Sequence, residues 1–489
     1  MKTYAVLFVL AFLASFVGTP LLQRLVARWG LLDSAFKAGP HQRRPIPRLG
    51  GVIIYLALLG TLLALFFPSN VITQEFRHQL PTLWLLWGPA TFILLVGVAD
   101  DIWGMKAWVK FGAQLGAAFW LVSAGVQISH LSLPWDHTVE LGWWAPLITL
   151  AWLVGVMNAF NLIDGLDGLA AGVAFLAASA IAVTAVMIND TMVVVITVAL
   201  AGALLGFLRH NFNPATIFLG DSGSLFVGFV LAAAAVVWHQ KATTAIAVAA
   251  PLLAFGLPVA ETVLTVMRRY LRGQHLFAAD RKHIHHTLLE LGLTSRQATM
   301  LLYATAAAGA LGCVLIARGH NMVTAAVIFS FLGVFAVIGY WIYPEFSEVG
   351  RGVSRNRLLA RVRAIEAIEL LRLARTRPEF CQRLQVAARV LEVDWVELRA
   401  ASHGPLDCAD AGNGGGRRDS STMVRMTVPL PSGGSLLLGR SPWRAHTEWS
   451  MEVVARQLSG VVEETLRGWK VSAALAAALA PGPESAGER

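Results

Sequence analysis

The sequence predicts an all-α polytopic membrane protein, of about eleven transmembrane helices, with a small α+β domain at its C-terminal end. Two observations carry this fold class. Hydrophobic residues make up 56% of the 489 residues and charged residues only 14%, which is too apolar for an ordinary soluble enzyme. Apolar runs long enough, or nearly so, to cross a bilayer follow one another through the first two thirds of the chain. The runs are 4–23, 50–67, 82–99, 107–126, 143–160, 168–188, 191–208, 222–238, 243–266, 298–317 and 322–343.

The first run begins after Lys2 and continues to Arg24 without a small-residue cleavage site, so we interpret it as a membrane helix rather than a signal peptide. Lys and Arg are concentrated in one alternate set of loops, and the positive-inside rule makes that side cytoplasmic. The N-terminus is then outside and the tail from about Glu345 is inside. This bias and anionic lipid headgroups explain the net charge of +9, so no nucleic acid partner is indicated.

The first cytoplasmic loop ends in Pro47-Arg48-Leu-Gly50-Gly51, where the prolines stiffen the chain and the glycines allow the next helix to begin close to a neighbour. An arginine on so rigid a segment suits a ligand that carries phosphate. Arg48 is the strongest candidate, whereas Arg43 and Arg44 could serve membrane topology alone.

The third run ends in Asp100-Asp101, and two adjacent carboxylates cannot both be buried and charged without a counter-ion. A divalent metal, or a lysine such as Lys106 or Lys110, would supply one. The C-terminus of a helix is electrostatically the wrong place for two carboxylates, which favours a functional role over a structural one.

The stretch Asn158-Ala-Phe-Asn161-Leu-Ile-Asp164-Gly-Leu-Asp167-Gly168 joins two apolar runs. Ionisable groups at membrane depth are costly and indicate a functional site. Asn158, Asn161 and Asp164 share a broad face of a helix, and Asp167 joins them only if the helix breaks near the glycines. A polar helix cap followed by a loop is the alternative.

Two further segments carry polar groups on the same predicted side. In Phe218-Leu-Gly-Asp221-Ser-Gly-Ser224, Asp221 is either a helix N-cap or a third carboxylate for a metal such as Mg²⁺. The loop His283-Ile-His285-His286 has no partner spacing for zinc, so its histidines suit a diphosphate or nucleotide, or a merely solvated basic loop. Cys313, Cys381 and Cys408 have no motif spacing.

The tail differs in composition from the rest of the chain. We therefore predict a membrane domain at 1–343, a small cytoplasmic α+β domain of unknown role at 344–480, and a disordered end at 481–489. Strands are predicted within 391–400 and within 423–439, the latter as a hairpin around Pro431-Ser-Gly-Gly434. Helices are predicted at 355–375 and 447–469, and a hairpin-like stretch at 129–142.

Together, these motifs resemble those of the polyprenyl-phosphate N-acetylhexosamine-1-phosphate transferases, over about residues 1–343. The motifs that carry the resemblance are Arg44-Pro-Ile-Pro-Arg-Leu-Gly-Gly51, Asp100-Asp101, Asn158–Gly168, Phe218–Ser224 and His283–His286. The resemblance implies transfer of a sugar-1-phosphate from a UDP-sugar to undecaprenyl phosphate with release of UMP. It implies Mg²⁺, with room for Mn²⁺, and a bacterial plasma membrane with the active site and tail domain in the cytoplasm. A homodimer is compatible with it, and the partner of the tail stays unknown.

The histidine loop and the Pro-Arg-Leu-Gly-Gly segment resemble the UDP-N-acetylglucosamine branch of that family. The branch that uses UDP-N-acetylmuramoyl-pentapeptide has a lysine soon after the paired aspartates, where this chain has Ile102-Trp103-Gly104-Met105. That substrate, or another UDP-N-acetylhexosamine, is the alternative. A membrane transporter is the competing class, but it predicts charges deep within the spans. Here those positions are nearly free of charge, with Glu261 as the exception.

By resemblance, each polar residue receives an expected role. Asp100 deprotonates or positions the lipid phosphate, and a covalent phosphoryl-aspartate on it stays open. The expected catalytic residues are Asp100, Asp101, Asp164 and Asp167. The expected metal ligands are Asp221 and Asp101. The expected substrate-binding residues are Arg48, Asn158, Asn161, His283, His285 and His286.

Overall fold

The structure is a computed structural model, and it forms two compact units by its internal contacts. One comprises Met1–Met267 and Phe277–Ile342, and the other comprises Arg268–Leu276 and Tyr343–Arg489. The residues that the structure describes are 2–28, 46–132, 138–241, 254–271, 283–316, 326, 330, 333, 367, 369–372, 377–390, 395–399, 424–429 and 435–440.

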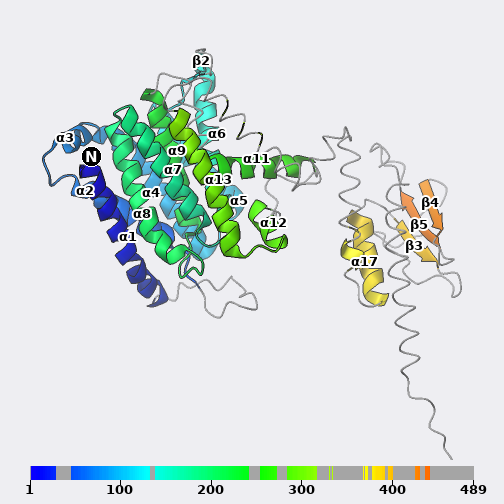
Figure 1. Cartoon of the computed structure of the whole chain (residues 1–489). Coiled ribbons are helices and arrows are strands. Elements are labelled where there is room, and N and C mark those ends of the chain that lie inside the picture. The colour runs from blue at the N-terminus through cyan, green and yellow to red at the C-terminus, as the bar shows by residue number, and fades with distance from the viewer. Residues whose placement is uncertain are drawn as a thin grey trace, which may run out of the picture. The chain divides into compact units, whose positions relative to one another are not determined.

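The first unit is a helical bundle (Figure 1). In its described residues the helices are α1 (Lys2–Arg28), α2 (Gly50–Ala64), α3 (Val71–His78), α4 (Leu80–Trp103), α5 (Ala107–Ser123), α6 (Ala145–Ile163), α7 (Leu169–Met187), α8 (Thr191–Asn211), α9 (Gly220–Lys241), α11 (Gly256–Leu271, with 256–267 in this unit), α12 (Ile284–Glu290) and α13 (Ser295–Ile316). Seven helices within the described part of the chain are long and apolar enough to cross a membrane: α1, α4, α6 with the turn before it, α7, α8, α9 and α13.

These seven helices support the prediction of a polytopic membrane protein. The runs predicted at 50–67 and 107–126 form the shorter helices α2 and α5, and the run at 243–266 is described only from Ala254 onward, mostly as α11. Most of the run at 322–343 lies outside the described residues, so the number eleven stays a prediction. Helices α8 and α9 are apolar on all sides and mostly buried, whereas α1 exposes apolar side chains as a lipid-facing helix does.

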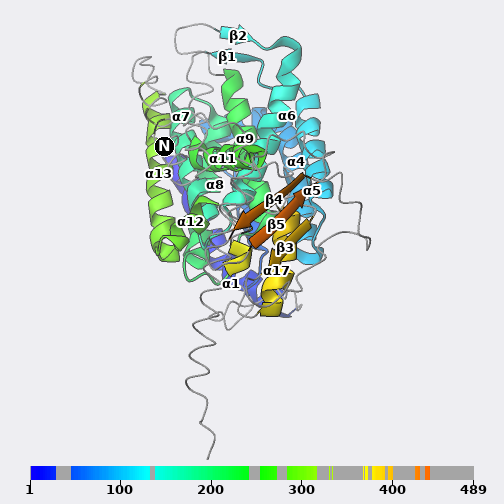
Figure 2. The ribbon, with the colours of Figure 1, turned by 90° about the vertical axis from the view of Figure 1, so that its right-hand side faces the viewer.

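The two ends of this unit differ in character. Strands β1 (His130–Ser132) and β2 (Thr138–Glu140) pair antiparallel between α5 and α6, which confirms the hairpin-like stretch at 129–142 (Figure 2). At the other end of α6 the helix stops at Ile163, and α7 begins at Leu169 after Gly168, whose φ is 77°. The predicted break between Asn158 and Gly168 is therefore confirmed, and it leaves the polar residues of that stretch at the end of the bundle away from the hairpin.

The second unit contains a helix and a small sheet in its described residues. Helix α17 (Arg377–Val390) precedes the strands β3 (Trp395–Arg399), β4 (Val424–Pro429) and β5 (Ser435–Arg440), which form an antiparallel sheet in the order β3-β5-β4. The predicted strands and the β4–β5 hairpin are confirmed, whereas α17 had not been predicted. The helix predicted at 447–469 and the end at 481–489 lie outside the described residues, as does most of 355–375.

Candidate active site

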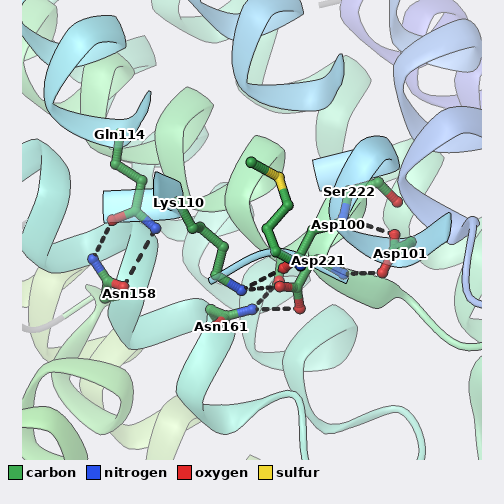
Figure 3. A network of polar contacts seen from close by, with 10 residues as sticks. Asp100, Asp101, Lys110, Gln114, Asn158, Asn161, Asp221 and Ser222 are labelled. Atoms are coloured by element: carbon green, nitrogen blue, oxygen red, sulfur yellow. Dashed lines mark hydrogen bonds and ion pairs between the residues drawn. The ribbon is translucent and has the colours of Figure 1, made fainter. Parts of the chain in front are cut away.

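Polar side chains from four helices converge at one end of the first unit (Figure 3). Asp100 and Asp101 lie in the last turn of α4, and Lys110 lies in the first turns of α5. Asn161 lies in the last turn of α6, and Asp221 lies in the first turn of α9. Each group sits at a helix end, where the chain leaves the apolar bundle and polar side chains meet one another at least cost.

The beginning of α9 is held in a tight fit between α2 and α4. The segment before α2 pairs with the segment before α9, since Phe218 N donates to Pro47 O at 2.8 Å and Gly51 N donates to Leu219 O at 3.1 Å. A Cβ atom at Gly51 or at Gly97 would overlap the backbone around Ser222, so both positions require glycine for this approach. The prediction that Gly50-Gly51 brings a helix close to its neighbour is thus confirmed.

Asp101 forms the cap of α9, although it belongs to α4. Its Oδ1 accepts a hydrogen bond from Asp221 N at 2.8 Å, and its Oδ2 accepts one from Ser222 N at 3.0 Å. The first N–H groups of a helix lack partners within the helix, and a carboxylate is favoured there by the helix dipole. The capping role considered for Asp221 therefore belongs to Asp101, whose assignment as a metal ligand and catalytic residue stays a prediction.

Lys110 is the cation that joins the remaining carboxylates. Its Nζ lies 2.8 Å from Asp100 Oδ2 and also contacts Asp221 Oδ2, while Met105 N donates to Asp100 Oδ1 at 2.6 Å. The side chains of Lys110, Asp100 and Asp221 are 18%, 12% and 27% exposed, so the ion pairs are largely enclosed. Of the two lysines proposed as counter-ions, Lys110 therefore fills this position.

The end of α6 contributes Asn161 and Asp164 to the same cluster. Asn161 Nδ2 donates to Asp221 Oδ1 at 2.8 Å and to Ser224 Oγ at 3.0 Å. Desolvation of the Asp164 carboxyl, together with the negative charges of Asp221 and Asp101, raises the pKa of Asp164 well above its ordinary value, although the Arg48 charge opposes this. The excess of carboxylates around Asp164 favours the binding of an additional cation at this place.

Two residues predicted for the site make other contacts. Asp167 Oδ2 accepts hydrogen bonds from Asn213 Nδ2 at 3.0 Å and from Ala215 N at 3.1 Å, so Asp167 holds the turn that precedes α9. The amide of Asn158 pairs with that of Gln114 on α5. Gln114 had not been singled out, although a glutamine inside the apolar run at 107–126 was a visible signal.

The histidine loop is anchored by Glu261 of α11. Glu261 is buried, and its Oε1 lies 3.2 Å from His283 Nδ1 and accepts a hydrogen bond from Ile284 N at 2.9 Å. The ring centroids of His283 and His286 lie 6.3 Å apart. The side chain of His285 is not among those that the structure describes. Glu261, which stood out as a charge within an apolar run, thus pairs with the start of the histidine loop.

An open pocket of about 430 Å³ lies over the carboxylate cluster. It is lined by Arg48, Asp100, Asp101, Gly104, Met105, Lys106 and Asp221. Its volume lies in the range of small-molecule sites, and its lining combines carboxylates with cations. Another cavity, of about 20 Å³ between α4, α8 and α9, has an apolar lining and offers no chemistry.

The donor set of this pocket fits Mg²⁺. Within the described residues, no group of three or more His, Cys, Asp or Glu is arranged to hold a metal ion. However, Asp100 and Asp221 already converge on one cation, the ammonium of Lys110. Mg²⁺ is usually held by one or two carboxylates, with waters and substrate phosphates completing the octahedron. Asp221 is the more exposed of the two carboxylates and the better candidate ligand.

Comparisons with known proteins place the chain among phosphotransferases. Residues 83–239 match the Glycosyl transferase family 4 model. The probable undecaprenyl-phosphate N-acetylglucosaminyl 1-phosphate transferase of Bacillus subtilis is 34% identical over 299 residues, which cover 61% of this chain and 80% of that protein. The decaprenyl-phosphate N-acetylglucosaminephosphotransferase of Mycolicibacterium smegmatis is 36% identical over 316 residues, covering 60% and 77%. The phospho-N-acetylmuramoyl-pentapeptide-transferase of Lactiplantibacillus plantarum is 35% identical over 260 residues, covering 50% and 77%.

Proposed function

Because the chain belongs to glycosyl transferase family 4 and is a sugar-phosphate transferase, we propose that it transfers N-acetylglucosamine-1-phosphate from UDP-N-acetylglucosamine to undecaprenyl phosphate. UMP is the second product, and the lipid-linked sugar starts a cell-envelope polysaccharide. The observation that supports this most is the enclosed Asp100–Lys110–Asp221 cluster at the helix ends, under an open pocket. The transporter alternative is set aside, since the relatives are phosphotransferases.

N-acetylglucosamine is favoured over N-acetylmuramoyl-pentapeptide by the extent of the matches. The relatives named for N-acetylglucosamine align over 299 and 316 residues, and the muramoyl-pentapeptide relative aligns over 260. The residues after Asp101 support the same choice, because no lysine follows within the turn that ends in Gly104.

The reaction is a displacement at the phosphorus that carries the sugar. An oxygen of the lipid phosphate attacks this phosphorus, the bond to the bridging diphosphate oxygen breaks, and UMP leaves with that oxygen. Such a transfer depends on positioning and charge neutralisation more than on covalent chemistry. Asp100 orients the lipid phosphate and accepts its proton where one is present, and Lys110 and Arg48 offset the charge of the phosphates.

Mg²⁺, held by Asp221 and the substrate phosphates, would neutralise the diphosphate and stabilise the departing UMP. Asn161 fixes the Asp221 carboxylate through Oδ1 and leaves the other oxygen facing Lys110. Asp101 contributes by keeping the beginning of α9, and hence Asp221, against α4. The histidines of the histidine loop, residues 283–286, would contact the diphosphate.

The bundle would lie in a bacterial plasma membrane with this end in the cytoplasm, because Lys and Arg are concentrated on that side. The N-terminus is then outside, and residues 344–480 form a cytoplasmic domain whose partner is unknown. Placing the pocket at the membrane surface lets a water-soluble nucleotide sugar meet a lipid-bound phosphate.

The test uses purified full-length protein in detergent with Mg²⁺, undecaprenyl phosphate and a panel of UDP-sugars. We expect UDP-N-acetylglucosamine to yield UMP and a lipid diphosphate sugar, and we expect no UMP without the lipid. Turnover with a different N-acetylated sugar would overturn the sugar assignment alone. Absence of turnover with every UDP-sugar would overturn the proposed function.

A further inference from the structure

A pair of side-chain amides joins α5 to α6 beside the carboxylate cluster (Figure 3). Gln114 Nε2 donates to Asn158 Oδ1 at 3.3 Å, and Asn158 Nδ2 donates to Gln114 Oε1 at 2.6 Å. Asn158 Nδ2 also donates to Val154 O on its own helix at 2.8 Å. We propose that this amide pair is a positioning device that sets the register of α5 against α6, so that Lys110 and Asn161 meet on the Asp221 carboxylate.

The spacing along the two helices supports this role. Gln114 follows Lys110 by four residues on α5, and Asn158 precedes Asn161 by three on α6. Residues three or four apart lie on the same side of a helix. Lys110 contacts Oδ2 of Asp221, and Asn161 donates to Oδ1 of the same carboxylate. The two helices are therefore tied twice on facing sides, once by the amides and once through Asp221.

The amide pair is suited to fixing register because its hydrogen bonds form in one register only. Lipid tails are as apolar as the side chains between helices, so no hydrophobic driving force holds the helices in register, and interhelical hydrogen bonds add to side-chain packing. Gln114 is fully buried, and a buried amide that loses its partner is costly. A slip of α5 by one residue moves a side chain by about 1.5 Å along the helix and turns it by about 100°, which would separate Lys110 from the Asp221 carboxylate that Asn161 holds.

The hydrogen bonds of Asn158 also argue against direct substrate binding by this residue. A side-chain amide has two N–H donors and one carbonyl oxygen. Both kinds of group are already engaged, the donors with Gln114 and Val154 and the oxygen with Gln114. Asn158 therefore acts through Asn161 and Lys110. This inference rests on the proposed function, because it assigns the pair to the same site.

The experiment compares four variants of the full-length protein: Gln114→Leu, Asn158→Leu, the double Leu variant, and the exchange Gln114→Asn with Asn158→Gln. The exchange keeps both amides and the combined length of the two side chains. We expect each single Leu variant to lose roughly ten- to a hundredfold in kcat, with a smaller change in KM for the UDP-sugar. The double variant should be little worse than the poorer single one, and the exchange should recover most of the turnover.

Thr149→Val is the matched control. Thr149 also lies on α6, but near the other end of that helix. Its Oγ1 accepts a hydrogen bond from Ile128 N at 2.9 Å and so stabilises the helix away from the cluster. This variant should lower the melting temperature while kcat is kept, which separates general destabilisation from misplacement of the cluster. A second readout needs no turnover: the rise in melting temperature caused by Mg²⁺ should shrink in the Leu variants and return in the exchange.

Two results would overturn the inference. One is a folded exchange variant that stays as impaired as the single Leu variants in both kcat and the Mg²⁺ response, since both amides are then present. The other is a rise in KM at unchanged kcat for Asn158→Leu alone, which would make Asn158 a direct substrate ligand. Should the Leu variants fail to fold, the exchange decides by itself. Lack of turnover by the wild-type protein would count against the proposed function, and the Mg²⁺ response would still decide on the amide pair.

Discussion

Lys110→Met tests whether the cation between Asp100 and Asp221 serves the reaction or only balances charge. Lys110 Nζ lies 2.8 Å from Asp100 Oδ2 and contacts Asp221, and its side chain is only 18% exposed. At an effective dielectric constant of about 20, two unit charges about 4 Å apart interact by about 4 kcal/mol. With part of this recovered by water and Mg²⁺, about 2–3 kcal/mol of transition-state stabilisation should be lost, or roughly 30- to 150-fold in kcat/KM.

The assay is UMP release titrated with Mg²⁺. Because Lys110→Met removes a positive charge beside two carboxylates, Mg²⁺ should bind more tightly and half-maximal activity should occur at lower Mg²⁺, even as the maximal rate falls. Lys106→Met removes a charge from the lining of the same pocket and should cause a smaller loss. Turnover of Lys110→Met close to wild type at saturating Mg²⁺ would refute the reasoning, since the metal would then replace the ammonium.

Three further predictions concern other members of the site. Asp221→Asn should lower the rate by about two orders of magnitude or more at any Mg²⁺ concentration, with little change in melting temperature, because charge but not shape is lost; retained turnover would move the metal elsewhere. Asp164→Asn should raise the melting temperature in EDTA at pH 8. Because the folded protein raises the pKa of Asp164, ionising this carboxyl lowers the free energy of unfolding at pH values above the ordinary aspartate pKa. The gain in melting temperature from Asp164→Asn should therefore shrink as the pH falls toward that ordinary value. A gain independent of pH would contradict this. Glu261→Ala should slow turnover roughly tenfold, whereas Glu261→Gln should keep most of the turnover, because Gln retains an acceptor for Ile284 N. Equal losses in the two variants would show that the charge of Glu261 matters more than this hydrogen bond.

Much of the site could be predicted because charges are rare in an apolar chain. Asp100, Asp101 and Asp221 stand at the ends of apolar runs, and the cost of burying a carboxylate marks them without a structure. The break between α6 and α7 also followed from local chemistry, since Gly168 adopts a left-handed conformation that favours glycine.

What the sequence could not show is which polar groups satisfy one another. Asp101 lies 120 residues before Asp221, and nothing local indicates that it caps α9 rather than facing the pocket. The partnership of Gln114 with Asn158 likewise depends on the register of two helices. Helix α17 was missed for a different reason, because helical periodicity is weak evidence in a charged segment whose stability comes from packing.

In the proposed reaction the substrates are anionic although the site is built from acidic residues, and the placement of these carboxylates offers a reason. Asp100 and Asp164 stand at helix C-termini, where the dipole adds negative potential, whereas Asp101 and Asp221 are offset by the N-terminus of α9. The local potential therefore attracts cations, and Lys110 already binds two of the carboxylates. A diphosphate is repelled by such a surface until further positive charge is present. The cluster is thus organised to bind cations, and in the proposed reaction a divalent ion would add the positive charge that phosphates require in a pocket that already contains a lysine.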